Sequence, residues 1–278
     1  MTYQHPLSKY VRVDRMPHIF CPGCGCGQIM NVMLQAVDEL KRDINKIVFV
    51  GGVGCNSRQV CWINGYAMHG LHGRAFAWAT GIVLANPELK VIVLTGDGDC
   101  AAIGGNHFIH AARRNIDMTV VVCNNFNYGM TGGQAAPTTP LGIHTTTTPF
   151  GNYENPFDLC ELAKAAGATY VSRWSTLTYP QLFRSFKKGI ERKGFSFIEV
   201  LSACPTNYGR RELKSSDPLV NMNNIKEITI TEKKASKLSP EELKGKIILG
   251  DFYEVEKPTF YEEYKKFIEP ARKKFKKI

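Results

Sequence analysis

The sequence lacks any apolar run near the roughly 20 residues that a helix needs to cross a bilayer, so we expect no membrane association. Its opening segment, MTYQHPLSKYVRVDR, lacks the apolar core of a secretory signal, which favours a cytoplasmic protein. Internal repeats and low-complexity tracts are also missing. With 278 residues, 44% hydrophobic and 22% charged, the chain can build a full core in one large domain or two small ones.

The sequence also lacks an excess of acidic residues, since its net charge is +10. Much of this positive charge lies in residues 209–278. The most basic stretch is the terminal segment YKKFIEPARKKFKKI. Clustered cations can bind the phosphates of a nucleic acid. The alternative is a solvated basic extension that docks an acidic partner, and we favour this second interpretation and expect no nucleic-acid partner.

Apolar runs of strand length alternate with helical patterns along the first three quarters of the chain. Near-continuous Val and Ile strands joined by helices predict an α/β fold, with an open, mainly parallel sheet and helices on both faces. We place the main domain at residues 1–208 and a basic C-terminal extension at 209–278, where the pattern becomes polar. The predicted strands are 46–50, 91–96, 118–125, 168–173 and 195–203, and the predicted helices are 27–42, 75–86, 105–114, 157–166 and 179–192.

Two polar motifs follow neighbouring predicted strands. TGDGD ends the strand at 91–96, VVCNN ends the strand at 118–125, and one predicted helix lies between them. Both motifs therefore emerge at the carboxyl edge of a parallel sheet, where α/β proteins bind ligands. Asp97 and Asn125 are hard oxygen donors suited to Mg²⁺ or Ca²⁺. The glycines beside Asp97 allow the backbone to approach a diphosphate, and the following helix offers it an N-terminus.

Nine cysteines are many for a chain expected in the cytoplasm, where clustered thiols indicate metal or redox chemistry. Cys21 and Cys24 lie in CPGCG, Cys55 follows the first strand, and Cys204 follows the last. Four thiolates at one sheet edge suit Zn²⁺ or a [4Fe–4S] cluster, and spacing alone does not decide. Cys26 is a rival fourth ligand that ranks below Cys204, because a C-x-C link is tighter than C-x-x-C. The other cysteines are expected to be packed thiols: Cys61, Cys100, Cys123 and Cys160.

The spacing of GDG, 25 residues and NN resembles the thiamine diphosphate motif of thiamine-dependent enzymes. That resemblance implies that Mg²⁺ is held by Asp97, the Asn125 side chain and the backbone carbonyl of Asn127. Together, CPGCG, GVGC, LHGRA, GDGD, NNFNYGMTGGQ and CPT resemble the β subunits of 2-oxoacid:ferredoxin oxidoreductases, and most closely the 2-oxoglutarate-specific members.

The family resemblance implies a thiamine diphosphate-binding fold and a [4Fe–4S] cluster on Cys21, Cys24, Cys55 and Cys204. It also implies which residues contact the diphosphate cofactor: Val53, Gly54, Asn56, His72, Gly98, Asp99, Gly129 and Met130. The implied activity is the coenzyme A-dependent oxidative decarboxylation of 2-oxoglutarate to succinyl-CoA and CO₂, with electrons passed to ferredoxin, or its reverse.

We identify no catalytic residue in this chain, because the family places the activating glutamate on a separate α subunit. The expected partners are therefore this α subunit, with or without γ and ferredoxin-like δ chains, and ferredoxin. Arg58, in a loop expected to face the cofactor, is a candidate receptor for the distal carboxylate of 2-oxoglutarate; the alternative is a solvated residue that balances phosphate charge.

Three other functions remain open. The substrate could be pyruvate or a branched-chain 2-oxoacid. The chain could be a thiamine-dependent decarboxylase without a cluster, although the cysteine set argues against this. It could also be a Zn²⁺-binding interaction subunit without catalytic activity, although the Asp97 and Asn125 pair argues against that interpretation.

Overall fold

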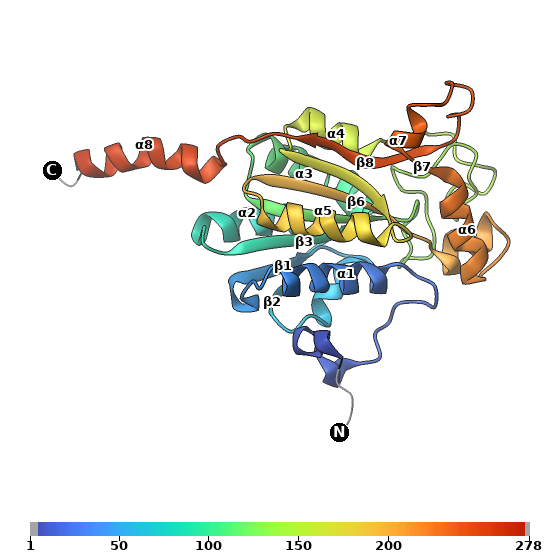
Figure 1. Ribbon diagram of the computed structural model, residues 1–278, viewed down its shortest axis with the longest axis horizontal. Helices are drawn as coiled ribbons and strands as arrows, with labels where there is room; N and C mark the ends of the chain where they lie inside the picture. Colours follow the sequence, from blue (N-terminus) through green and yellow to red (C-terminus); the bar gives the residue numbers. More distant parts are fainter. Residues whose placement is uncertain (1–4, 276–278) are drawn as a thin grey trace.

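The central strands come from the most apolar runs in the chain. In the computed structural model, which describes residues 5–275, β3 (Lys90–Gly96) and β4 (Met118–Asn124) are buried along nearly their whole length. Strands covered on both faces bury both sets of side chains, which explains why these runs do not alternate between polar and apolar residues. The predicted α/β sheet is confirmed (Figure 1).

The eight strands pair in the order β2-β1-β3-β4-β6-β5-β8-β7. Every pairing is parallel except that of β5 with β8, which is antiparallel. The five predicted strands are present with small shifts at their ends, whereas β2, β7 and β8 were not predicted. The remaining bounds are β1 (Ile47–Gly51), β2 (Tyr66–His69), β5 (Tyr170–Ser175), β6 (Phe195–Leu201), β7 (Thr229–Thr231) and β8 (Ile247–Glu254).

Helices cover both faces of the sheet and build one core on each face (Figure 1). Helices α1 (Cys26–Glu39) and α5 (Tyr179–Glu191) pack together over one face. The other face is covered by α2 (Ala75–Ala85), α3 (Gly105–Arg113) and α4 (Leu159–Ala166). All five of these helices were predicted. No helix within residues 5–275 is long and apolar enough to span a bilayer.

The segment predicted as a C-terminal extension contributes to the same sheet, since β8 pairs with β5. Its helices are α6 (Pro218–Ile228), α7 (Glu232–Ala235) and α8 (Phe260–Phe275). Helix α8 projects away from the sheet (Figure 1). The last three residues of the predicted basic terminal stretch lie outside the described part of the chain.

Parallel pairing brings the carboxyl ends of β1, β3, β4 and β6 to one edge of the sheet. The loops that follow these strands carry the glycine loop at 51–56, TGDGD, the NNFNYG segment and Cys204. The topology therefore places these four segments at one edge.

The core behind this edge contains an aromatic cluster centred on Phe108 of α3. The fully buried ring of Phe108 packs against Phe76, Phe195 and Phe197, so its removal tests this core. Phe108→Ala should lower the free energy of unfolding by about 3–5 kcal/mol, the usual cost of removing a buried aromatic ring. Chemical denaturation followed by circular dichroism measures it. Asn106→Ala, at an exposed position of the same helix, is the control and should have little effect; equal losses would mean that the aromatic cluster does not support this core.

Candidate functional site

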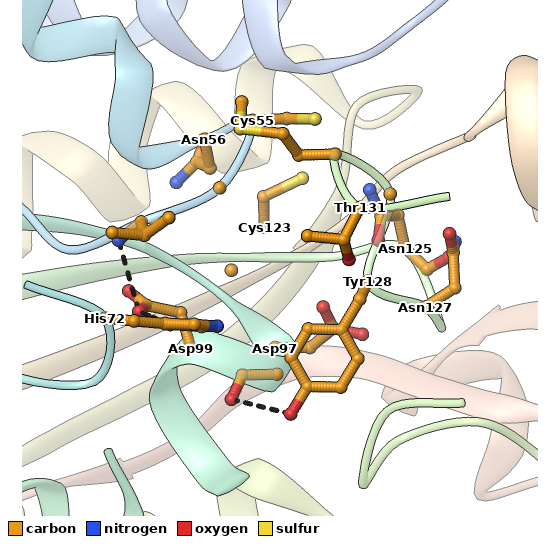
Figure 2. Close-up of a pocket in the computed structure, with 16 residues that line it drawn as sticks. Cys55, Asn56, His72, Asp97, Asp99, Cys123, Asn125, Asn127, Tyr128 and Thr131 are labelled. Atoms are coloured by element: carbon orange, nitrogen blue, oxygen red, sulfur yellow. Dashed lines mark hydrogen bonds and ion pairs between the residues drawn. The ribbon is translucent and has the colours of Figure 1, made fainter. Parts of the chain in front are cut away.

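A pocket lies where the loops after β1, β3 and β4 meet (Figure 2). Every residue predicted to contact the diphosphate or Mg²⁺ lines it. The pocket also includes Cys55, Cys123, Tyr128 and Thr131, and its full lining is Val53, Gly54, Cys55, Asn56, His72, Gly96, Asp97, Gly98, Asp99, Cys123, Asn125, Asn127, Tyr128, Gly129, Met130 and Thr131. The structure thus brings together residues that are widely separated in the sequence.

The Asp99 carboxylate is buried at the centre of these loops and is only 3% exposed. It accepts hydrogen bonds from the backbone N–H groups of Val53 (3.2 Å) and Gly73 (2.7 Å), the hydroxyls of Thr95 (2.7 Å) and Ser57 (3.4 Å), and the ring of His72. Its oxygens are fully engaged inside the chain, so the side chain organises the pocket. A Cβ at Gly52 would lie 2.1 Å from Asp99 Oδ2, which explains why glycine is required there.

The His72 ring is oriented by Asp99. Nδ1 faces the carboxylate, and because an ionised carboxylate can only accept, we place the ring proton on Nδ1. This leaves Nε2 as the second polar atom of a ring that lines the pocket beside Tyr128 (Figure 2). The two rings meet edge to face, with centroids 6.0 Å apart.

The Tyr128 ring closes the pocket against the backbone of Gly98. Its hydroxyl donates a 3.4 Å hydrogen bond to the Gly98 carbonyl oxygen (Figure 2). A Cβ added at Gly98 would lie 2.3 Å from the ring, so any larger residue would displace Tyr128.

Three residues that bear oxygen donors are buried beside this glycine: Asp97, Asn125 and Asn127, the last through its backbone carbonyl. Burial raises the pKa of Asp97 to about 7, although a hydrogen bond donated by the Thr138 hydroxyl (2.6 Å) opposes this shift. A divalent cation would favour the ionised carboxylate again, and oxygen donors are the ligands that Mg²⁺ prefers. The donor set therefore fits Mg²⁺.

Sequence reasoning did not identify Thr138, Thr95 or Ser57 as parts of the site. Thr138 belongs to the long loop over 128–152, whose length and Gly, Pro and Thr content are typical of functional loops. No pattern in the sequence connects it to Asp97. Cys123 was predicted to be a packed thiol; it is buried and also lines the pocket.

The four predicted cluster cysteines lie near one another at the side of the pocket. Burial raises the pKa of Cys55 to about 12, and negative charge on Cys24, Cys123, Cys204 and Cys21 contributes to this shift. Cys204 Sγ lies 3.9 Å from Asn127 Oδ1, which connects this group to the oxygen donors. The sulfurs therefore gather around Cys55.

These cysteines are not arranged around a single ion. Within residues 5–275, no three His, Cys, Asp or Glu side chains are placed to hold one metal ion. Zn²⁺ needs its sulfur ligands about 2.3 Å from one centre, whereas a [4Fe–4S] cluster binds each cysteine at a different iron. The Cys26 sulfur contacts the Cys123 sulfur, at 3.8 Å. The donor chemistry of these thiols thus suits a cluster better than a single ion.

Arg58 lies on the 3₁₀ helix at Ser57–Cys61 and not in the expected loop, and it is not among the residues that line the pocket. Its Nε atom is buried without a hydrogen-bond partner in the described part of the chain. Its charge also contributes to lowering the pKa of His69, after burial as the main cause. The guanidinium thus has one donor atom, Nε, without a hydrogen-bond partner among the described residues.

Comparison with known proteins gives consistent results. Residues 52–200 match the family described as thiamine pyrophosphate enzyme, C-terminal TPP binding domain. The 2-oxoglutarate synthase subunit KorB of Methanocaldococcus jannaschii is 54% identical over 96% of this chain and 99% of its own length. The 2-oxoacid:ferredoxin oxidoreductase subunit beta of Saccharolobus solfataricus is 40% identical, over 88% of this chain and 84% of its own length.

A solved structure shares the fold. It is the 2-oxoglutarate:ferredoxin oxidoreductase from Magnetococcus marinus with 2-oxoglutarate, coenzyme A and succinyl-CoA bound. The TM-score is 0.84 and the identity 32%, and the match covers 97% of this chain and 91% of that one.

Asp99→Asn tests the organisation of the pocket. The amide would face backbone N–H donors with its own N–H₂ group and lose charge-assisted hydrogen bonds, each contributing about 1.5–3 kcal/mol. We expect thiamine diphosphate to bind roughly ten- to hundredfold more weakly, measured by calorimetric titration of the assembled complex. Asp14→Asn, at an exposed position, is the control. Equal affinity in the two variants would show that Asp99 does not support the site.

Proposed function

The chain belongs to the β subunits of 2-oxoacid:ferredoxin oxidoreductases, a thiamine pyrophosphate enzyme family, and we propose that it holds the thiamine diphosphate, Mg²⁺ and [4Fe–4S] cluster of a 2-oxoglutarate synthase. The assembled enzyme would convert 2-oxoglutarate and coenzyme A to succinyl-CoA and CO₂, with electrons passing to ferredoxin, or catalyse the reverse. Pyruvate and branched-chain 2-oxoacids are the alternative substrates.

One observation carries this proposal: the buried residues Asp97, Asn125 and Asn127, which bear oxygen donors, and the predicted cluster ligand Cys55 line a single pocket. Oxygen donors suit a cation that anchors a diphosphate, and thiolates suit an electron carrier. A carbon–carbon bond cleavage that releases electrons needs both groups in proximity.

Thiamine diphosphate would supply the carbon nucleophile and the electron sink for the reaction. The residues of this chain bind and orient it. Asp97, Asn125 and the carbonyl of Asn127 would hold Mg²⁺ against the diphosphate. Asp99 fixes the surrounding loops, and the Tyr128 ring packs against the backbone of Gly98. The cluster would be held by Cys21, Cys24, Cys55 and Cys204.

The proposed partner is an α subunit that supplies the activating glutamate. No glutamate of the described residues lines the pocket, so this chain offers no carboxylate for that role there. We expect the cofactor to lie between the two chains, with ferredoxin as electron acceptor and with further γ and δ chains where the complex has them.

The assembled complex should reduce ferredoxin when given 2-oxoglutarate and coenzyme A, and succinyl-CoA should accumulate. This chain alone, reconstituted with its cofactors, should be inactive. Dye reduction and product analysis measure both. Activity of the isolated chain would refute a catalytic site shared between this chain and the α subunit. A colourless, iron-free complex that contains zinc would favour the non-catalytic Zn²⁺-binding function, and one that decarboxylates without iron would favour a simple decarboxylase.

Asp97→Ala should abolish thiamine diphosphate binding, because the variant loses the anionic ligand of the cation that anchors the diphosphate. Iron content and the circular dichroism spectrum should stay unchanged. Calorimetric titration of the cofactor into the complex is the measurement. Glu154→Ala, at an exposed position of the adjoining loop, should bind normally. Unchanged affinity in Asp97→Ala would overturn the cation site.

Arg58 is the proposed receptor for the second carboxylate of 2-oxoglutarate, since its Nε has no other partner. Loss of such a contact costs about 2–5 kcal/mol, so Arg58→Leu should lower kcat/KM for 2-oxoglutarate by roughly one to three powers of ten. Pyruvate and 2-oxoisovalerate should be unaffected or improved. Arg15→Leu, which is exposed, is the control. A uniform loss for all three substrates would assign Arg58 to the cofactor.

A further inference from the structure

A second cavity, of about 720 Å³, shares no lining residue with the pocket described above. Its walls come from the ends of β4 and β6, from the chain between Thr138 and Asp158, and from the segment that follows residue 207. Thr138 connects the two spaces, because it lines the cavity while its hydroxyl donates to Asp97. The volume lies in the range of small-molecule sites, and the proposed reaction does not use this cavity.

Aromatic and aliphatic side chains form much of the wall of this cavity. Four aromatic rings line it: Phe126, Phe157, Tyr208 and Phe252. The rings of Phe126 and Tyr208 pack together, with centroids 5.8 Å apart. The Arg173 guanidinium lies 5.5 Å from the centroid of the Phe252 ring, so one cation already lies against an aromatic ring in this wall. The wall can therefore bury the apolar body of a ligand and also accept a positive charge.

The charged residues of the lining are mostly acidic. Its two basic residues are Arg173 and Lys246, and its five carboxylates belong to Asp158, Glu161, Glu199, Glu212 and Glu232. Both basic groups are engaged within the chain. Arg173 forms ion pairs with Glu199 (2.6 Å) and Asp158 (2.5 Å), and Lys246 Nζ donates to the Glu227 carbonyl oxygen at 2.7 Å. The excess charge of the cavity is therefore negative.

Two of these carboxylates stand at the open side of the cavity. Glu161 lies in the first turn of α4 and Glu232 is the first residue of α7, and both are exposed. Within residues 5–275, neither carboxylate forms an ion pair or accepts a side-chain hydrogen bond. Glu212, in contrast, accepts hydrogen bonds from the backbone N–H and the ring of His144. The acceptors left for a ligand are thus Glu161 and Glu232.

We propose that this cavity binds a small organic cation, with its ammonium group held by the carboxylates at the rim and its apolar body against the aromatic wall. An ammonium group can donate to Glu161 and Glu232 and is attracted by the faces of aromatic rings. An anion would meet only carboxylates without a counter-charge, because Arg173 and Lys246 are already engaged. Binding needs neither thiamine diphosphate nor iron, so this site does not rest on the proposed function.

The test is a ligand-observed NMR titration of the full chain, alone and in the assembled complex, with three probes of similar shape: benzylammonium, benzyl alcohol and benzoate. Benzylammonium should bind roughly tenfold more tightly than benzyl alcohol, which is the combined effect of an ion pair and a cation–π contact. Benzoate should bind most weakly.

Three variants locate the cation. The double variant Glu161→Gln/Glu232→Gln should lose most of the preference for benzylammonium, and circular dichroism checks that it is folded. Phe157→Leu, at a ring that is 53% exposed, keeps apolar bulk without an aromatic face and should lose part of that preference. Glu88→Gln, at an exposed position outside the cavity, is the matched control and should bind all three probes as the wild type does.

Each other outcome overturns the proposal. Equal affinity for the three probes, or no binding of any, would show that the cavity does not select a cation. A preference for benzylammonium that survives in the folded double variant would place the cation away from Glu161 and Glu232. Binding to the isolated chain but not to the complex would show that a partner chain fills the cavity. A complex that lacks iron or thiamine diphosphate would refute the proposed function alone, because the titration depends on neither.

Discussion

The pocket depends on one buried carboxylate. Asp99 is hydrogen-bonded to the glycine loop after β1, to the segment at His72 and Gly73, and to the end of β3. The first two of these segments are distant from Asp99 in the sequence. Charge-assisted hydrogen bonds to buried donors are strong, and the donors would be costly to leave unpaired. Without them, the loops could not hold a constant spacing around a diphosphate. The same close approach explains the glycine at position 52.

A second buried network supports the site from within the sheet. Asn124 donates to Glu199 at 2.7 Å, and the Arg173 guanidinium bonds Glu199 at 2.6 Å and Asp158 at 2.5 Å. Asn124 immediately precedes the predicted Mg²⁺ ligand Asn125. Arg173 and Glu199 form the buried ion pair of this network, and removing either partner would leave an uncompensated charge. The hydrogen bond from Asn124 connects the end of β4 to this pair. The oxygens of the pocket are thus positioned from both sides.

The main strands and helices were predictable because their patterns are local and strong. β3 and β4 are continuous apolar runs, and α5 is amphipathic. β2 and β8 were not predicted because their local patterns are weak. β2 is largely exposed, and β8 is partly buried and joins the sheet by pairing with β5. The site residues followed from the strands, since parallel pairing necessarily gathers the motifs that end them.

The sequence by itself determined which chemical groups stand at the carboxyl edge of the sheet: the aspartates of TGDGD, the asparagines of NNFN and the cysteines of CPGCG. Only the tertiary structure decided which partners each of these groups contacts. Asp97 lies beside Thr138 and the two asparagines, whereas Asp99, two residues later, is engaged by three loops. Cys26 at the start of α1 contacts Cys123 near the end of β4. The physical reason is that a buried side chain takes its partners from segments distant in the chain, and local spacing does not encode that choice.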